Sequence, residues 1–245
     1  MTPETKKRLA AEAAVREIRD GMAVGLGTGS TAVFAIVEIG RRMREEGLRI
    51  TAIPTSRESE TNAVAQGIPL VTFAQCPRLN LTIDGADWID PRSLDVIKGY
   101  GGALLWEKIV AAASDRLIII ADDTKLVVRL GEGKKIPVEV VPFGWETTAA
   151  RIETLGGMFE VRRGADGTTF TTDSGHIILD CVFEPSADPA ALERALAMTI
   201  GVVETGLFIG MAGTAFVAGA ESMMRLDRGP DAPGGVRTTV IPYEV

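Results

Sequence analysis

Two short segments of the sequence bring carboxylates, a lysine and glycines together near predicted turns. The first segment ends an apolar run with Asp84 and Asp87, which flank a Gly-Ala pair. The second opens with Lys98, continues with three glycines within four residues, and carries Glu107. Carboxylates near a lysine can move protons, and glycines let backbone amides approach a ligand closely. The spacing therefore indicates an acid–base site.

A glycine-rich loop at residues 25–31 lies between a predicted strand and a predicted helix. Backbone amides at a helix N-terminus bind phosphate, and hydroxyl groups add donors. Ser30 replaces the third glycine of a dinucleotide fingerprint, and no acidic residue ends the next predicted strand. No Gly-Lys-Ser/Thr of a P-loop follows. The loop therefore predicts either a monophosphate site or a helix cap made by Ser30 and Thr31, and both alternatives stay open.

The acidic residues also have ordinary structural interpretations. Asp84 and Asp87 fit a simple turn, because Asp and Gly are common turn residues. Glu107 alone would be a solvated helix residue. However, Ala103 and Ala111 stand four residues before and after it, so its helix face is small and apolar. Burial there would raise the pKa of Glu107 into the range of a general base.

Strands and helices alternate through the first half of the chain. Predicted strands cover residues 22–26, 48–53, 70–73, 79–83, 95–97 and 117–121, and predicted helices cover residues 6–19, 31–46, 57–66 and 103–114. This alternation indicates a Rossmann-like α/β domain with a doubly wound parallel sheet. Ligands bind outside the carboxyl ends of such strands, where Gly27, Asp84 and Lys98 are expected. Lys125 follows another strand and is either a ligand at the same edge or a surface lysine. Lys6 and Lys7 are expected to be surface charges of the first helix, and Lys108 is expected to face solvent.

The pattern changes after residue 130. Predicted strands cover residues 138–141, 158–162, 177–182 and 201–204, and predicted helices cover residues 145–155 and 189–198. This β-α-β-β-α-β order is typical of a ferredoxin-like fold. We therefore predict a catalytic Rossmann-like domain of residues 1–130 plus 207–245 and a smaller ferredoxin-like α+β domain of residues 131–206. No element is predicted in the tail from Arg228.

Composition excludes several classes of protein. The chain has 245 residues and a net charge of −7, which argues against nucleic acid as a partner. Two cysteines and one histidine cannot build a Cys/His metal site, and the cysteines are expected to be free thiols in a reducing compartment. The N-terminus does not read as a signal peptide, and no run is apolar enough to span a membrane. The sequence thus predicts a cytoplasmic protein without membrane contact.

Five motifs together resemble the type A ribose-5-phosphate isomerase family. They lie, in order, at residues 25–32, 53–56, 84–87, 98–108 and 122–125. The resemblance extends from the first predicted helix to about residue 220. It implies interconversion of D-ribose 5-phosphate and D-ribulose 5-phosphate through an enediolate in the pentose phosphate pathway, without metal or organic cofactor. It also implies a sugar phosphate as the small-molecule ligand, and a homodimer or a dimer of dimers.

The resemblance also implies roles for individual residues. Glu107 would be the proton-transferring base, Lys98 would stabilise the developing oxyanion, and Asp84 and Asp87 would hold sugar hydroxyls. The substrate-binding residues would be Thr28, Gly29, Ser30, Thr31, Asp84, Gly85, Ala86, Asp87, Lys98, Gly99, Tyr100, Gly101 and Lys125. The family's loop often reads Lys-Gly-Gly-Gly, whereas Tyr100 stands at the third position here. A positive φ would strain a tyrosine there, and otherwise its ring would line the entrance to the site.

Two other functions compete with this interpretation. An acyl-CoA transferase on a related fold would use a glutamate as nucleophile, bind a CoA thioester and form a glutamyl adduct. A non-catalytic sugar-phosphate sensor would bind ribose 5-phosphate without converting it.

Overall fold

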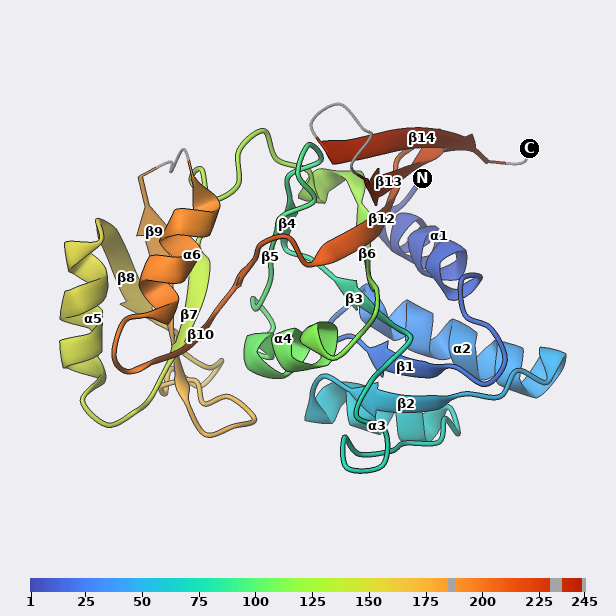
Figure 1. Ribbon diagram of the computed structural model, residues 1–245, viewed down its shortest axis with the longest axis horizontal. Coiled ribbons are helices and arrows are strands. Elements are labelled where there is room, and N and C mark those ends of the chain that lie inside the picture. The colour runs from blue at the N-terminus through green and yellow to red at the C-terminus, as the bar shows by residue number, and fades with distance from the viewer. Residues whose placement is uncertain (185–187, 230–234, 244–245) are drawn as a thin grey trace.

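The structure is a computed structural model that describes residues 1–184, 188–229 and 235–243 (Figure 1). Residues 185–187, 230–234 and 244–245, which fall within the predicted domain ranges and the tail, lie outside the described residues. No helix in the described ranges is long and apolar enough to cross a membrane.

Helices and strands alternate along the chain much as predicted. The helices are α1 (Pro3–Val15), α2 (Ala32–Glu46), α3 (Arg57–Ala65), α4 (Leu104–Ala112), η1 (Asp123–Lys125), α5 (Trp145–Thr154) and α6 (Pro189–Ala197). The strands are β1 (Ala23–Leu26), β2 (Thr51–Pro54), β3 (Leu81–Gly85), β4 (Trp88–Ile89), β5 (Val96–Ile97), β6 (Leu117–Asp122), β7 (Ile136–Val140), β8 (Gly157–Val161), β9 (Ile177–Phe183), β10 (Val202–Thr205), β11 (Leu207–Phe208), β12 (Ala212–Ala218), β13 (Ser222–Arg228) and β14 (Val236–Pro242).

A seven-stranded sheet in the order β14-β13-β12-β6-β3-β1-β2 forms the larger part of the molecule. The five strands from β12 to β2 are parallel, and β13 and β14 are antiparallel. Side chains of a strand alternate between faces, so Ile118 and Ile120 of β6 join the core under α1 and α2, whereas Ile119 joins the core on the opposite face. The predicted Rossmann-like α/β fold is confirmed.

A four-stranded antiparallel sheet in the order β10-β7-β9-β8 forms a smaller body with α5 and α6, at the left in Figure 1. Its elements follow the β-α-β-β-α-β order, so the predicted ferredoxin-like fold is confirmed. Its core contains Val138, Ile152 and Leu179, all inaccessible to solvent. The predicted division at residues 131–206 remains our proposal.

Several segments differ from the expected elements. β4 and β11, which were not predicted, form a separate three-stranded sheet with β5. Instead of forming a strand, residues 70–73 contribute one parallel bridge, from Leu70 to Ala52 of β2. The chain turns directly afterwards, where Cys76 N donates to Thr72 O. A further difference is the hairpin of β13 and β14, whose second strand lies in the tail. Apart from Val236, the residues of β14 are exposed, so no apolar alternation marked the strand.

Candidate active site

The carboxyl ends of neighbouring parallel strands gather the predicted polar motifs at one edge of the large sheet. β3 lies between β1 and β6, and Leu26 of β1 pairs with Ile83 of β3, so Gly27 lies beside Asp84. A Cβ atom on Gly27 would lie 2.2 Å from Oδ1 of Asp84. Only glycine therefore lets the loop after β1 pack against Asp84.

Hydrogen bonds fix the start of the glycine loop. The Thr28 amide donates to Asp84 Oδ1 over 3.1 Å. The Thr28 hydroxyl lies 2.7 Å from the hydroxyl oxygens of both Thr55 and Ser56, which follow β2. Three strand ends thus hold one loop, which explains why the motifs at residues 25–31, 53–56 and 84–87 occur together.

The end of the loop is arranged as an anion site. α2 begins at Ala32, and the side chain of its N-cap residue Thr31 makes no capping hydrogen bond. Ser30 Oγ instead accepts a hydrogen bond from Lys7 Nζ at 2.9 Å. The geometry does not support the capping interpretation of these hydroxyls. Two hydroxyls, a lysine and a helix N-terminus favour an anion.

Lys98 joins two buried carboxylates. Its Nζ lies 3.0 Å from Asp84 Oδ2 and 3.2 Å from Glu107 Oε1, and it donates to Gly85 O at 2.6 Å. All three acidic or basic side chains are at most 6% exposed. Burial lowers the pKa of Lys98, but the charges of Asp84 and Glu107 outweigh it and raise the pKa above its usual value. One ammonium therefore serves two carboxylates.

The pKa of Glu107 reflects its burial in this cluster, where two carboxylates share one ammonium. Burial raises its pKa to about 8, against the opposing charge of Lys98 and with the help of the charge of Asp84. The burial predicted from Ala103 and Ala111 is confirmed, since the residue is 5% exposed. Its Oε2 atom is buried and makes no hydrogen bond within the described part of the chain. Glu107 therefore has one oxygen held by Lys98 and one available for a proton.

These groups surround a cavity of about 220 Å³. It is lined by Thr28, Gly29, Ser30, Thr31, Gly85, Ala86, Asp87, Lys98, Gly99, Gly101, Glu107 and Lys125. Every predicted site residue except Asp84 and Tyr100 is in this set. Asp84 does not line the cavity and forms an ion pair with Lys98 instead. Burial also raises the pKa of Asp87, although the Tyr100 amide and Lys98 oppose the change.

Tyr100 is directed away from the cavity. Its hydroxyl accepts from Trp88 Nε1 and donates to Lys135 O, both at 3.0 Å. The positive φ angles of the loop fall on Gly99 and Gly102 and not on Tyr100, so the tyrosine fits without strain. Its predicted contact with substrate remains a prediction.

Comparisons with known proteins point to one family. A family model described as "Ribose 5-phosphate isomerase A (phosphoriboisomerase A)" matches residues 51–222. Ribose-5-phosphate isomerase A of Synechococcus sp. (strain JA-3-3Ab) is 53% identical over 90% of this chain and 96% of its own. The protein of that name from Gloeobacter violaceus is 55% identical over 86% of this chain and 91% of its own.

The chain belongs to the ribose 5-phosphate isomerase A family.

Solved structures show the same architecture. A D-ribose-5-phosphate isomerase in complex with phospho-erythronic acid covers 93% of this chain and 100% of its own, with 33% identity and a TM-score of 0.90. The enzyme of Methanocaldococcus jannaschii covers 98% of this chain and 100% of its own, with 35% identity and a TM-score of 0.86. Family membership argues against an acyl-CoA transferase.

Two lysines make contacts that the sequence did not predict. Lys7 was expected to be a surface charge of the first helix, and from the surface of α1 it also reaches Ser30. No local pattern marks it, because the contact joins residues far apart in sequence. Lys108 was expected to face solvent, and this was wrong. Its Nζ lies 2.6 Å from Glu204 Oε1 and donates to Leu207 O at 2.9 Å.

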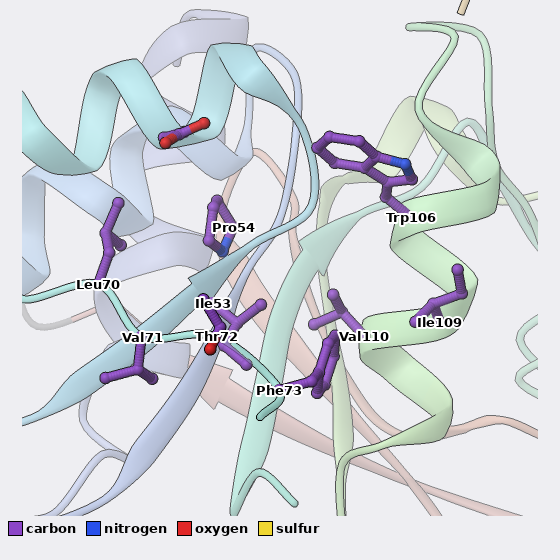
Figure 2. Close-up of a pocket in the computed structure, with 10 residues that line it drawn as sticks. Ile53, Pro54, Leu70, Val71, Thr72, Phe73, Trp106, Ile109 and Val110 are labelled. Carbon is purple, nitrogen blue, oxygen red and sulfur yellow. The ribbon is translucent and has the colours of Figure 1, made fainter. Parts of the chain in front are cut away.

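A second cavity, of about 460 Å³, lies beside α4 (Figure 2). Trp106, Ile109 and Val110 of α4 face Ile53 and residues 70–73 across it. Among its lining residues only Glu60 is ionisable, and no lysine or arginine lines it. Because a phosphate needs cationic or amide donors, the smaller cavity is the better sugar-phosphate site.

Proposed function

We propose that this chain interconverts D-ribose 5-phosphate and D-ribulose 5-phosphate, with Glu107 as the base. The observation that carries the proposal is the environment of Glu107. It is a buried carboxylate with a raised pKa and one unpaired oxygen, beside Lys98 and within the cavity wall. A base with a pKa near the working pH is most effective in proton transfer.

The phosphate would bind at the start of α2. The hydroxyls of Ser30 and Thr31 and the amides of the glycine loop supply donors, and Lys7 and Lys125 supply positive charge. Lys6 pairs with Asp123 at 2.6 Å, which holds the start of α1 beside the turn that carries Lys125. A phosphate fixed at this end would set the register of C1 and C2 over Glu107.

The isomerisation would follow from these positions. Once the sugar ring is open, Glu107 Oε2 takes the proton from C2, the C2–H electron pair forms the C1–C2 double bond, and the π pair of the C1 carbonyl moves onto O1 to give an enediolate. Glu107 returns the proton to C1, while a proton moves from O2 to O1. Asp87, whose pKa is also raised by burial, would hold the sugar hydroxyls during this exchange. Asp84 would act indirectly, because it holds Lys98 and the Thr28 amide in position.

Lys98 would stabilise the enediolate in a particular order of events. In the free protein its ammonium donates to Gly85 O and forms ion pairs with Asp84 and Glu107. When Glu107 accepts the proton it loses its charge, so one N–H of Lys98 becomes available to the oxyanion. Stabilisation then appears with the charge that develops in the transition state.

Two further features belong to this proposal. We propose a homodimer or a dimer of dimers, and a cytoplasmic location. Sedimentation of the purified chain tests the first, and fractionation of cells that produce the chain tests the second.

The central experiment follows ribose 5-phosphate in excess EDTA, with Glu107→Gln as the matched variant. We expect ribulose 5-phosphate from the wild type and at least a 100-fold slower reaction in the variant, the lower end of what a general base contributes, about 10²-fold to 10⁴-fold. Binding without conversion by both proteins would favour the sensor. Conversion only after metal is added would refute the metal-free mechanism.

A further inference from the structure

A basic residue beside the smaller sheet contacts the loop of residues 98–102, here called the catalytic loop, from outside the cavity. Arg162 directly follows β8, and its Nη1 donates to Gly99 O at 2.7 Å and to Tyr100 O at 3.1 Å. Its other donors bind Asp180 of β9, with Nε 2.9 Å from Oδ2 and Nη2 on Oδ1. Both side chains are 13% exposed. This two-point pairing on a strand holds the guanidinium in one orientation.

The carbonyls that Arg162 binds determine where the amides of the same peptides point. In a trans peptide the N–H is directed opposite to the C=O. In the peptide that joins Gly99 to Tyr100, Arg162 binds the carbonyl and Asp87 Oδ2 accepts from the amide at 2.9 Å. In the next peptide, the carbonyl of Tyr100 faces Arg162, so the amide of Gly101 faces the opposite side. Gly101 lines the cavity, so an amide on the side opposite Arg162 could donate to a ligand there.

Other residues of the smaller sheet's connections contact the same region. A Cβ atom on Gly102 would lie 2.4 Å from Cζ of Phe170, so this ring packs directly against the loop. Ser174 Oγ accepts from Trp106 Nε1 at 2.8 Å, and Glu204 pairs with Lys108. The residues on either side of Glu107 are thus held by the smaller sheet and its loops, and Arg162 does the same for the loop that begins at Lys98.

We propose that Arg162, fixed by Asp180, is a positioning residue of the isomerase: it orients the peptides of Gly99 and Tyr100 so that Asp87 and the Gly101 amide meet the substrate. This inference rests on the proposed function. Arg162 does not line the cavity and touches no reacting atom, so its effect is transmitted through the backbone of the loop. The smaller sheet is then part of the active-site scaffold.

The test compares Arg162→Met with Arg163→Met. Arg163 is the adjacent residue, is exposed, and its Nη1 contacts only Thr169 Oγ1 among the hydrogen bonds of the described chain. We expect kcat of Arg162→Met per folded molecule to fall on the order of 10-fold to 100-fold, the size of effect that a displacement of about 1 Å produces in an active site. The Arg163 variant should stay within about twofold of the wild type, because exposed residues without special contacts have small effects.

Two further variants distinguish a positioning role of Arg162 from a purely structural role. Arg162→Lys keeps a charge and one donor, so it should recover part of the lost kcat, and Asp180→Asn should reproduce part of the loss. All rates are taken well below each variant's unfolding midpoint. If Arg162→Met keeps the wild-type kcat and KM per folded molecule, or if it merely lowers the unfolding midpoint, the inference is wrong.

Binding of phospho-erythronic acid, measured by calorimetry, distinguishes failure of this inference from failure of the proposed function. Its planar carboxylate resembles an enediolate and would use the Gly101 amide. We expect Arg162→Met to bind it at least 10-fold more weakly than the wild type, whereas Arg163→Met should bind it normally. Lack of turnover by the wild type would overturn the proposed function only. Unchanged binding by Arg162→Met, with or without turnover, would overturn the positioning role.

Discussion

Lys98 Nζ lies 3.2 Å from Glu107 Oε1, and both side chains are almost completely buried. Neither residue could occupy this position alone without a large desolvation cost. Asp84 shares the same ammonium, so the cluster carries a net negative charge when both carboxylates are ionised. The proton that Glu107 holds or loses is therefore the variable that controls this site.

The first prediction concerns the pH dependence of activity. Because the base must be ionised to accept the C2 proton, and its pKa is raised to about 8, kcat/KM should rise as the pH increases through that value. The measurement is kcat/KM for ribose 5-phosphate between pH 6 and 9, a range chosen around that value. A profile that stays flat across the range would contradict the assignment of Glu107.

The second prediction concerns the stability of the same site. A folded-state pKa above the unfolded value of 4.5 favours the protonated form, so this contribution is fully present below 4.5 and is lost as the pH rises through about 8. Glutamine cannot ionise. The Tm of Glu107→Gln minus the Tm of the wild type should therefore increase as the pH rises from 5 to 9, as measured by scanning calorimetry. A difference in Tm that shrinks with rising pH would show that the sign is wrong.

The third prediction uses the second carboxylate of the cluster. Lys98→Met leaves Asp84 and Glu107 buried without a counter-charge, which should destabilise the fold by about 3–5 kcal/mol. Adding Asp84→Asn removes one of the unpaired charges, so the double variant should unfold at higher denaturant concentration than Lys98→Met alone. Chemical denaturation of Lys98→Met, Asp84→Asn and the double variant measures this. Additive losses in the double variant would mean that the two charges do not interact.

Much of this arrangement was predictable from the sequence because it depends on local patterns. Glycine and aspartate directly after apolar strands predicted the site at the carboxyl edge, and the alanines beside Glu107 predicted its burial. Contacts between distant elements left no such pattern. Lys7 reaches Ser30, and Arg162 reaches Gly99, across separate segments of the chain. The exposed strand β14 lacked the apolar alternation by which a strand is recognised.

The fourth prediction separates phosphate binding from chemistry. Lys7→Ala should raise KM for ribose 5-phosphate about 10-fold, because a hydrogen bond to a charged group contributes roughly 1.5–3 kcal/mol, whereas kcat should change little. Arg8→Ala is the matched control on the same helix turn, since Arg8 is exposed and pairs with Glu12 and not with the loop. Steady-state kinetics of both variants gives the KM and kcat values to compare. Equal effects of the two variants on KM would show that Lys7 does not contact the phosphate.

The fifth prediction compares two glycines of the catalytic loop. Gly102 has a φ of +84°, and a Cβ there would lie 2.4 Å from Phe170, so Gly102→Ala should displace the loop from the smaller sheet and lower kcat. A Cβ on Gly101 would meet no atom within 4 Å in the free protein. Gly101→Ala should therefore leave the unfolding midpoint nearly unchanged while it raises KM, because Gly101 lines the cavity that we propose for the substrate. Calorimetry and steady-state kinetics on both variants test this contrast. An unchanged kcat for Gly102→Ala would show that contact with Phe170 does not determine the position of the loop. A lowered midpoint for Gly101→Ala would show that the folded loop does not accommodate a methyl group at Gly101.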